Sequence, residues 1–259
     1  MRETNLNLKL APGIKLVNSW PCLYIKDIDA LVIADLHLGF EMIKTEQEGV
    51  AIPKVQVKQL LEMMQKILRM QKASTIIING DVKHEFSEGS HHEYKEVSDF
   101  LEFFSRNFKK VFLIKGNHDN FLIRATRRFE NVELRDDFKI GEFYFAHGHK
   151  PLDLKRISAK NVIIAHEHPA LALYDELRIK EKVKCLLHGK IAGKFVIILP
   201  AVSIFAPGTD VNTVARKEFL TPLLQKYGVD DLEAVGIVEG EECLEFPKIS
   251  KLRAHFKLL

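Results

Sequence analysis

Hydrophobic and polar positions follow two different periods along this chain. Several apolar segments of four or five residues end abruptly in polar or turn residues, which is typical of buried strands. Between them lie longer segments in which apolar residues recur every three or four positions, the pattern of an amphipathic helix. The pattern predicts one helix that begins at Pro53 and a second helix over roughly 91–106. It predicts strands at 30–34, 75–79, 111–114, 143–146 and 161–165.

The two ends of the chain have a strand-rich pattern. Residues 6–34 indicate β-hairpins, since the turn segments "APG" and "SWP" separate short apolar runs. After residue 165 most apolar segments again indicate strands. Strands and helices alternate early and strands dominate later, so we expect an α/β fold of two packed sheets with helices outside. No repeat or linker divides the sequence, and a single domain over 1–259 is expected.

Composition narrows the class of protein without naming a substrate. Of 259 residues, 46% are apolar and 28% charged, the balance of a soluble protein with a sizeable core. The net charge of +3 permits nucleic acid or another anionic substrate but does not require one. The three cysteines form no CxxC pair, there is no signal-peptide-like apolar segment, and no apolar run approaches the roughly 20 residues of a membrane span. We therefore expect a cytoplasmic protein with reduced thiols and no membrane partner.

Polar side chains that carry chemistry follow each of the five central strands. Ligand sites in α/β sheets lie outside the carboxyl ends of the strands, so these groups can converge. Gly80 and Gly116 allow the chain to turn sharply and bring them close. In strand order, the groups are Asp35 and His37; Asp81; Asn117, His118 and Asp119; His147 and His149; and His166 and His168.

The residue types favour a transition-metal site. Nitrogen and oxygen ligands without thiolate suit manganese, iron, zinc or nickel better than calcium or a structural zinc. A carboxylate can bridge two ions about 3.5–4 Å apart, the separation used for displacement at phosphorus. Any one of these residues alone would indicate a helix cap, a turn or a strand-end imidazole. Five strand ends with the same chemistry favour a metal centre.

The ordered motifs resemble those of the calcineurin-like metallophosphoesterases. Residues 35 to 168 carry the series Asp-x-His, Gly-Asp, Gly-Asn-His-Asp, His-Gly-His and His-x-His, with Ala165 where the last motif usually has glycine. The segments "ADLHLGFE", "GDVKHEF", "AHEHPAL" and "LPAVSIFAPGTDVN" further resemble the ICC-like predicted phosphoesterases. That subgroup is related to SbcD-type and DNA-ligase-associated phosphoesterases, and the likeness extends over nearly the full length.

The resemblance implies a four-layer α/β/β/α sandwich of two mixed sheets with two divalent metal ions at the sheet edges. It implies that His118 binds no metal but stabilises the transition state or protonates the leaving oxygen, with Asp119 orienting it. A metal-bridging water would be the nucleophile. The implied ligands are Asp35, His37 and His168 for the first ion, Asn117, His147 and His166 for the second, and Asp81 as the bridge.

The expected activity is metal-dependent hydrolysis of phosphate esters, with a phosphodiesterase favoured. A DNA-processing nuclease, a small-molecule phosphatase or cyclic-nucleotide phosphodiesterase, and a non-catalytic protein-binding scaffold remain as alternatives. The presence of Asn117 and His118 favours catalysis over the scaffold. Manganese is the expected metal, and iron, zinc, nickel and magnesium remain open.

Several nearby residues have two interpretations. His84 and Glu85 follow the bridging carboxylate and line either the substrate side or a solvated loop. His149 is predicted to contact substrate phosphate or to support the second metal. Asp119 either caps a helix, orients His118, or does both. The segment 199–212 is either a turn-rich loop or an edge of the substrate cleft.

Overall fold

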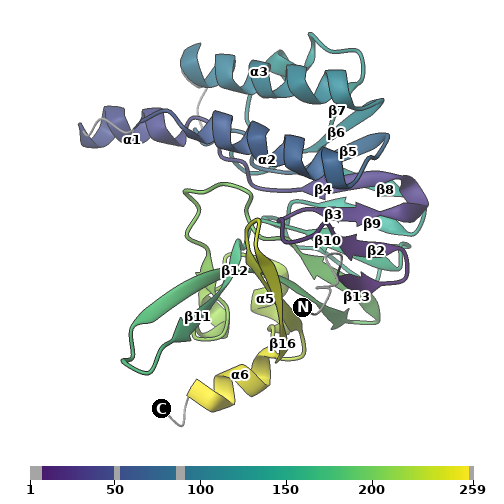
Figure 1. Ribbon diagram of the computed structural model, residues 1–259. Coiled ribbons are helices and arrows are strands. Elements are labelled where there is room, and N and C mark those ends of the chain that lie inside the picture. Colours follow the sequence, from purple (N-terminus) through teal and green to yellow (C-terminus); the bar gives the residue numbers. More distant parts are fainter. Residues whose placement is uncertain (1–7, 50–52, 86–90, 257–259) are drawn as a thin grey trace.

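Two mixed sheets lie face to face, and helices cover the outer face of each (Figure 1). The computed structural model describes residues 8–49, 53–85 and 91–256. Three apolar clusters fill the spaces between the four layers. The expected α/β/β/α sandwich is confirmed.

The first sheet follows chain order from β1 to β7. Its early strands form an antiparallel meander, which confirms the hairpins expected at 6–34, and the later strands continue from β4 in parallel. Strands β4 and β5 are buried along their whole length, as expected for parallel strands covered on both faces. The strands are β1 (Lys9–Ala11), β2 (Ile14–Leu16), β3 (Leu23–Ile25), β4 (Ala30–Ile33), β5 (Thr75–Asn79), β6 (Lys110–Ile114) and β7 (Val132–Arg135).

Two long helices, α2 (Gln56–Met70) and α3 (His91–Asn107), pack their apolar stripes on the first sheet. Helix α2 begins three residues later than Pro53 suggested. Its first free N–H groups, at Val55 and Gln56, donate to the Glu41 carboxylate at 2.7 and 3.0 Å, so the helix is capped from another element. Glu41 belongs to α1 (Phe40–Glu48), which the sequence pattern did not predict because it lacks a regular apolar stripe. The short helix α4 (Ile123–Thr126) follows β6.

The second sheet has the order β14-β11-β12-β13-β10-β9-β8, and β15 pairs with both β12 and β16. Strands β9, β10 and β13 run parallel, and β11 and β12 form a long antiparallel hairpin. Two short helices, α5 (Pro222–Tyr227) and α6 (Ile249–Phe256), and the 3-10 turn η2 (Arg216–Glu218) lie on its outer side; a second such turn, η1 (Lys26–Ile28), precedes β4. The strands are β8 (Asp137–Ile140), β9 (Phe143–Ala146), β10 (Asn161–Ile164), β11 (Pro169–Tyr174), β12 (Lys180–Ile191), β13 (Lys194–Ile198), β14 (Thr209–Asp210), β15 (Glu233–Val238) and β16 (Glu242–Lys248).

The two sheets are held together by large apolar side chains from both. The rings of Phe112 and Phe138, one from each sheet, stack with centroids 4.2 Å apart. Ile114 and Ile163 are fully buried in the same layer. This packing brings the carboxyl ends of strands from both sheets to one edge of the molecule.

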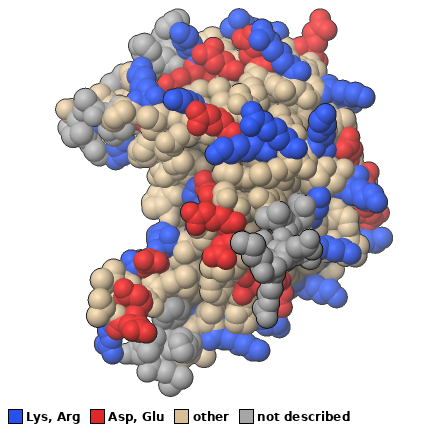
Figure 2. All heavy atoms as spheres, in the orientation of Figure 1, with Lys and Arg blue, Asp and Glu red and all other residues tan. Residues whose placement is uncertain are grey.

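That edge lies on a concave side of the protein. Helix α1 projects above it and the β11–β12 hairpin below it, and the space-filling view shows the surface hollowed between them (Figure 2). Basic and acidic side chains are interspersed on the face shown (Figure 2). Among the described residues, no helix combines the length and the apolar character needed to cross a bilayer.

Candidate metal centre

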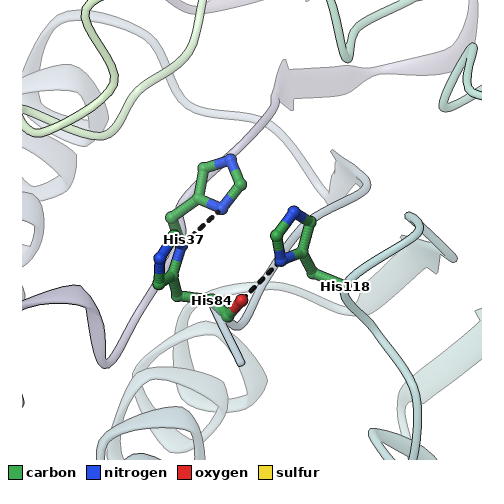
Figure 3. Close-up of side chains that lie close together, drawn as sticks. All are labelled: His37, His84 and His118. Carbon is green, nitrogen blue, oxygen red and sulfur yellow. Dashed lines mark hydrogen bonds between the residues drawn. The ribbon is translucent and has the colours of Figure 1, made fainter. Parts of the chain in front are cut away.

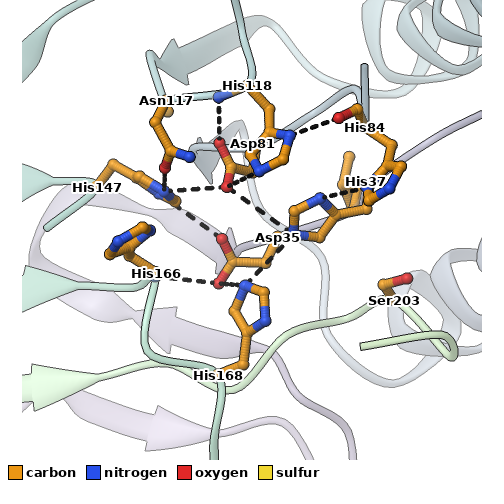
Figure 4. A network of polar contacts seen from close by, with 12 residues as sticks. Asp35, His37, Asp81, His84, Asn117, His118, His147, His166, His168 and Ser203 are labelled. Atoms are coloured by element: carbon orange, nitrogen blue, oxygen red, sulfur yellow. Dashed lines mark hydrogen bonds and ion pairs between the residues drawn. The ribbon is translucent and has the colours of Figure 1, made fainter. Parts of the chain in front are cut away.

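The loops that follow β4, β5, β6, β9 and β10 bring the predicted ligands into a single network (Figure 4). Because β4 to β6 belong to the first sheet and β9 and β10 to the second, both sheets contribute. The residues that meet there are Asp35, His37, Asp81, Asn117, His118, His147, His166 and His168.

The backbone at this edge is unusual. Residues other than glycine rarely have positive φ, and such strain is concentrated at functional sites. Neighbouring Ala165 is not among the positive-φ residues, so alanine fits where the family motif usually has glycine. Five residues of the network are left-handed: Asp35 (φ 55°), His37 (48°), Asp81 (48°), His166 (69°) and His168 (47°).

Two glycines allow the ligand loops to approach closely. A Cβ atom on Gly80 would lie 2.0 Å from Nδ1 of His147. A Cβ atom on Gly116 would lie 2.0 Å from Oδ1 of Asp81 and 2.4 Å from its backbone nitrogen. Both distances are far below van der Waals contact, so a side chain at either position would displace a predicted ligand. The close approach expected at these glycines is confirmed.

The first ligand group consists of Asp35, His37, Asp81 and His168, whose ligand atoms lie within 4.8 Å of one another. Nε2 of His168 lies 3.3 Å from Nε2 of His37 and 3.4 Å from Oδ2 of Asp35. Two ligands bound at about 2.1 Å to one tetrahedral ion are separated by about 3.4 Å. Oδ1 of Asp35 is buried and accepts no hydrogen bond from the described part of the chain. The same oxygen lies 3.6 Å from Nδ1 of His147, so the spacing and this oxygen without a hydrogen bond fit a positive charge such as a metal ion.

The second ligand group consists of Asp81, His147 and His166. Nε2 of His147 lies 3.2 Å from both Oδ2 of Asp81 and Oδ1 of Asn117, so the amide oxygen joins the group. Nδ1 of His147 donates to the carbonyl of Asn79 at 3.1 Å, the outer contact that commonly orients a metal-binding imidazole. Asp81 belongs to both groups, as a bridging ligand would.

Burial and the carboxylates of Asp35 and Asp81 shift the pKa values of the histidines at the site in different directions. Burial alone would lower the pKa of His147, but its hydrogen bond to Asp81 and the nearby charges raise it to about 9. Burial would raise the pKa of Asp81, yet His147 holds it below its usual value. Burial lowers the pKa of His37 to about 3 and that of His166 to about 4, which keeps both imidazoles neutral and able to bind metal at pH 7.

Metal binding is expected to release a proton from His147. In the metal-free protein this imidazole stays protonated below its pKa of about 9, and a protonated nitrogen cannot bind metal. The proton on His147 should therefore make apparent metal affinity rise about tenfold per pH unit up to about pH 9 and then level off. Titration calorimetry in buffers of different ionisation enthalpy measures the release at pH 7.5. An affinity that does not change between pH 7 and 9 would contradict it.

The loop after β5 contacts both a predicted ligand and the predicted acid. Nδ1 of His118 donates to the backbone carbonyl of His84 (Figure 3). This leaves Nε2 of His118 facing the ligand groups, 3.9 Å from Oδ2 of Asp81. Nδ1 of His84 lies 3.3 Å from Nδ1 of His37. The His84 ring therefore supports the His37 ring, whose Nε2 faces the first ligand group. These three histidines are also close enough to form a third cluster of potential ligands.

The Asp119 carboxylate accepts hydrogen bonds from the backbone of two loops. It accepts hydrogen bonds from the N–H groups of Val82 and Gly116, both at 2.8 Å. Helix α4 begins without a side-chain cap. The helix-cap interpretation is therefore wrong, because this fully buried carboxylate is turned toward the loops after β5 and β6. The acceptor that the structure places at Nδ1 of His118 is the carbonyl of His84.

His149 and the segment 199–212 both lie at the site. The His149 ring is 5.3 Å from the His147 ring and 6.0 Å from that of His166, beside the second group. The segment 199–212 edges the first group, because the backbone N–H of Ser203 donates to the carbonyl of Asp35 at 3.1 Å. The segment therefore lies at the first group, and its role as an edge of the substrate cleft stays a prediction.

Two buried residues that hold the ligand loops had no distinguishing sequence signal. The Gln56 side chain donates to the carbonyl of His37 at 3.0 Å and to Oγ of Ser203 at 3.1 Å, so it joins two site loops. Glu93 accepts from the backbone N–H groups of His84 and Glu85, at 3.2 and 2.9 Å. Both lie in the first turn of a helix, where polar residues are common, and their partners are distant in sequence.

Comparison with known proteins decides the family. Residues 28–230 match the family model of the calcineurin-like phosphoesterases. The chain belongs to this family. It is accordingly a metal-dependent phosphoester hydrolase, as the motifs predicted, and the His and Asp clusters are its candidate metal-binding groups.

The solved structures that this phosphoesterase resembles have low sequence identity to it. The nuclease MPE from Pseudomonas putida is 18% identical, with a TM-score of 0.61 over 89% of this chain and 96% of that one. Yfce, a phosphoesterase from E. coli, is 15% identical, with a TM-score of 0.40 over 68% of this chain and 80% of that one. No curated protein matches the sequence significantly. Membership of the ICC-like subgroup stays a prediction.

Proposed function

We propose that this phosphoesterase hydrolyses phosphodiesters with two divalent metal ions. The observation that supports it best is the position of Asp81, which is shared by both ligand groups. The nitrogen and oxygen donors without thiolate favour manganese, with iron, zinc, nickel and magnesium as alternatives. In this proposal Asp35, His37 and His168 hold the first ion, Asn117, His147 and His166 hold the second, and Asp81 bridges them.

The metals and His118 have separate tasks in this proposal. When bound, the ions supply positive charge to the phosphoryl group and lower the pKa of water. His118 donates its Nδ1–H to the carbonyl of His84, which leaves Nε2 to hold the proton that the leaving oxygen requires. The backbone N–H of His118 donates to Oδ1 of Asp81 at 3.0 Å, which holds this histidine close to the bridging carboxylate.

A nuclease activity is the second candidate. It is supported by the likeness in fold to the nuclease from Pseudomonas putida and by the concave side on which the site lies. The net charge of +3 and the interspersed charges in Figure 2 provide no strong attraction for a long polyanion. Simple phosphodiesters are therefore the first substrates to test, and DNA the second.

Purified protein with manganese is expected to hydrolyse bis(p-nitrophenyl) phosphate faster than p-nitrophenyl phosphate. Removal of metal with EDTA should abolish the activity, and addition of manganese should restore it, with two ions bound per chain. Absorbance of p-nitrophenolate and elemental analysis measure both quantities. Absence of hydrolysis with manganese, iron, zinc, nickel and magnesium would contradict the proposed function. A preference for the monoester would favour a phosphatase, and one ion per chain would contradict the metal pair.

A further inference from the structure

A small cavity of about 170 Å³ opens beside the first ligand group. Two of the residues that line it, His37 and His168, are proposed ligands, so its occupant would lie beside the first ligand group. Ser203 and His84 line it as well (Figure 4). The remaining wall is apolar and consists of Phe40, Phe205, Ala206 and Pro207.

Two aromatic rings shape the apolar wall. The rings of Phe40 and Phe205 stack with centroids 4.9 Å apart and planes inclined by 11°. The His84 ring meets Phe40 edge-on at 4.9 Å. Both phenylalanines are only half-buried, whereas large apolar side chains usually lie in the core. An apolar surface that adjoins a polar catalytic site is a common feature of ligand pockets.

The wall is anchored to the metal-binding loops. The N–H of Phe205 donates to Oγ of Ser203 at 3.3 Å, and the backbone N–H of Ser203 donates to the carbonyl of Asp35. Phe40 follows His37 by three residues, and its N–H lies 3.4 Å from the His37 carbonyl. The backbone segments that carry both rings are therefore hydrogen-bonded to the loops of the first ligand group.

We propose that this cavity binds the base of a nucleotide ester and that Phe40 and Phe205 determine this specificity. The inference rests on the proposed phosphoesterase function and names its substrate class. The cavity is smaller than a typical drug-sized site of 300–1,000 Å³, so it accommodates a single ring system. Its aromatic wall offers stacking, and the partly exposed His84 ring offers hydrogen bonding to a polar ring edge. An alkyl or sugar substituent would gain none of the stacking.

Inhibition tests the proposal directly. Initial rates of methyl p-nitrophenyl phosphate hydrolysis are measured with adenosine 5′-monophosphate or ribose 5-phosphate as inhibitor, which differ only in the base. We expect the nucleotide to have a Ki about 5- to 100-fold lower, the range of one base stacked on an aromatic ring. In Phe205→Ala the ratio of the two Ki values should approach one, and Phe205→Trp should restore it. The control is Tyr94→Ala, an exposed aromatic residue that does not line the cavity, which should keep the wild-type ratio.

Each remaining outcome bears on one of the two proposals. Equal Ki values in the wild type, or an unchanged ratio in folded, metal-loaded Phe205→Ala, would overturn the base pocket. If that variant does not fold, Phe205→Leu keeps an apolar side chain without a flat ring and should show the same loss. Phenyl phosphate binding as tightly as the nucleotide would overturn the choice of a nucleotide. If the wild type hydrolyses no ester, the proposed function fails. Calorimetry on manganese-loaded protein then still measures the ratio of the affinities for adenosine 5′-monophosphate and ribose 5-phosphate, which tests the base pocket separately.

Discussion

Replacing His118 by alanine is expected to lower kcat for the diester by roughly 10²–10⁴-fold, the usual contribution of a positioned acid or base. The two metal ions should remain bound, because the proposed ligand atoms come from other side chains. The Nδ1–H of this histidine already donates to the His84 carbonyl, so only Nε2 is left to act on the phosphoryl group. Stopped assays with manganese and elemental analysis of the same sample measure both effects.

The choice of substrate and control makes the His118→Ala result specific. An ester with a good leaving group, such as p-nitrophenolate, needs little protonation, so the defect should be smaller than for an alkyl leaving group. His188→Ala removes a half-buried histidine of β12 outside the ligand groups and should leave kcat within about twofold, the scale of a neutral change. Loss of a metal ion from His118→Ala would show that this histidine is a ligand and would contradict its role as an acid.

Replacing Asp81 by asparagine is expected to weaken metal binding by more than about 100-fold, since loss of an outer contact alone costs 10–100-fold. Asparagine keeps the size of the side chain and can still accept the N–H of His118, which aspartate accepts at 3.0 Å. It loses the negative charge that two adjacent cations require. Elemental analysis after gel filtration should find fewer than two ions per chain, and diester hydrolysis should fall to background at micromolar manganese.

The Asp81→Asn prediction has a charge-matched control. Asp153→Asn removes one negative charge at a largely exposed position outside the ligand groups, and should keep normal metal content. Excess manganese should restore part of the activity of Asp81→Asn if the remaining ligands are in place. Two tightly bound ions in Asp81→Asn would contradict the bridging role.

Much of the fold was predictable because its central elements have strong periodicity. The five strands that end in chemistry-bearing residues, and the helices α2 and α3, all bury continuous apolar segments or stripes. Helices α1, α5 and α6 were not predicted, because each is short or lacks a regular apolar stripe. Such helices are stabilised by tertiary contacts, as the Glu41 carboxylate at the start of α2 illustrates.

The order of residue types at the strand ends indicated which side chains could form a metal centre, but it did not indicate the contacts that support them. Asp119 was expected to cap a helix or orient His118, yet its carboxylate accepts backbone N–H groups from the loops after β5 and β6. A sequence shows which carboxylate follows a strand but not which N–H groups the next loop presents to it. The same limit applies to Gln56 and Glu93, whose partners lie on other loops.

The sequence by itself indicated the family, a set of candidate metal-binding residues and the two-sheet architecture. These depend on local order, because parallel strands of one sheet end at a common edge wherever they stand in the chain. Only the tertiary structure decided how Asp81 is shared by two ligand groups and how the His84 carbonyl turns His118. It also brought Phe205 against Phe40 beside the first group. Those contacts join residues far apart in the chain, and the packing of the two sheets sets their distances.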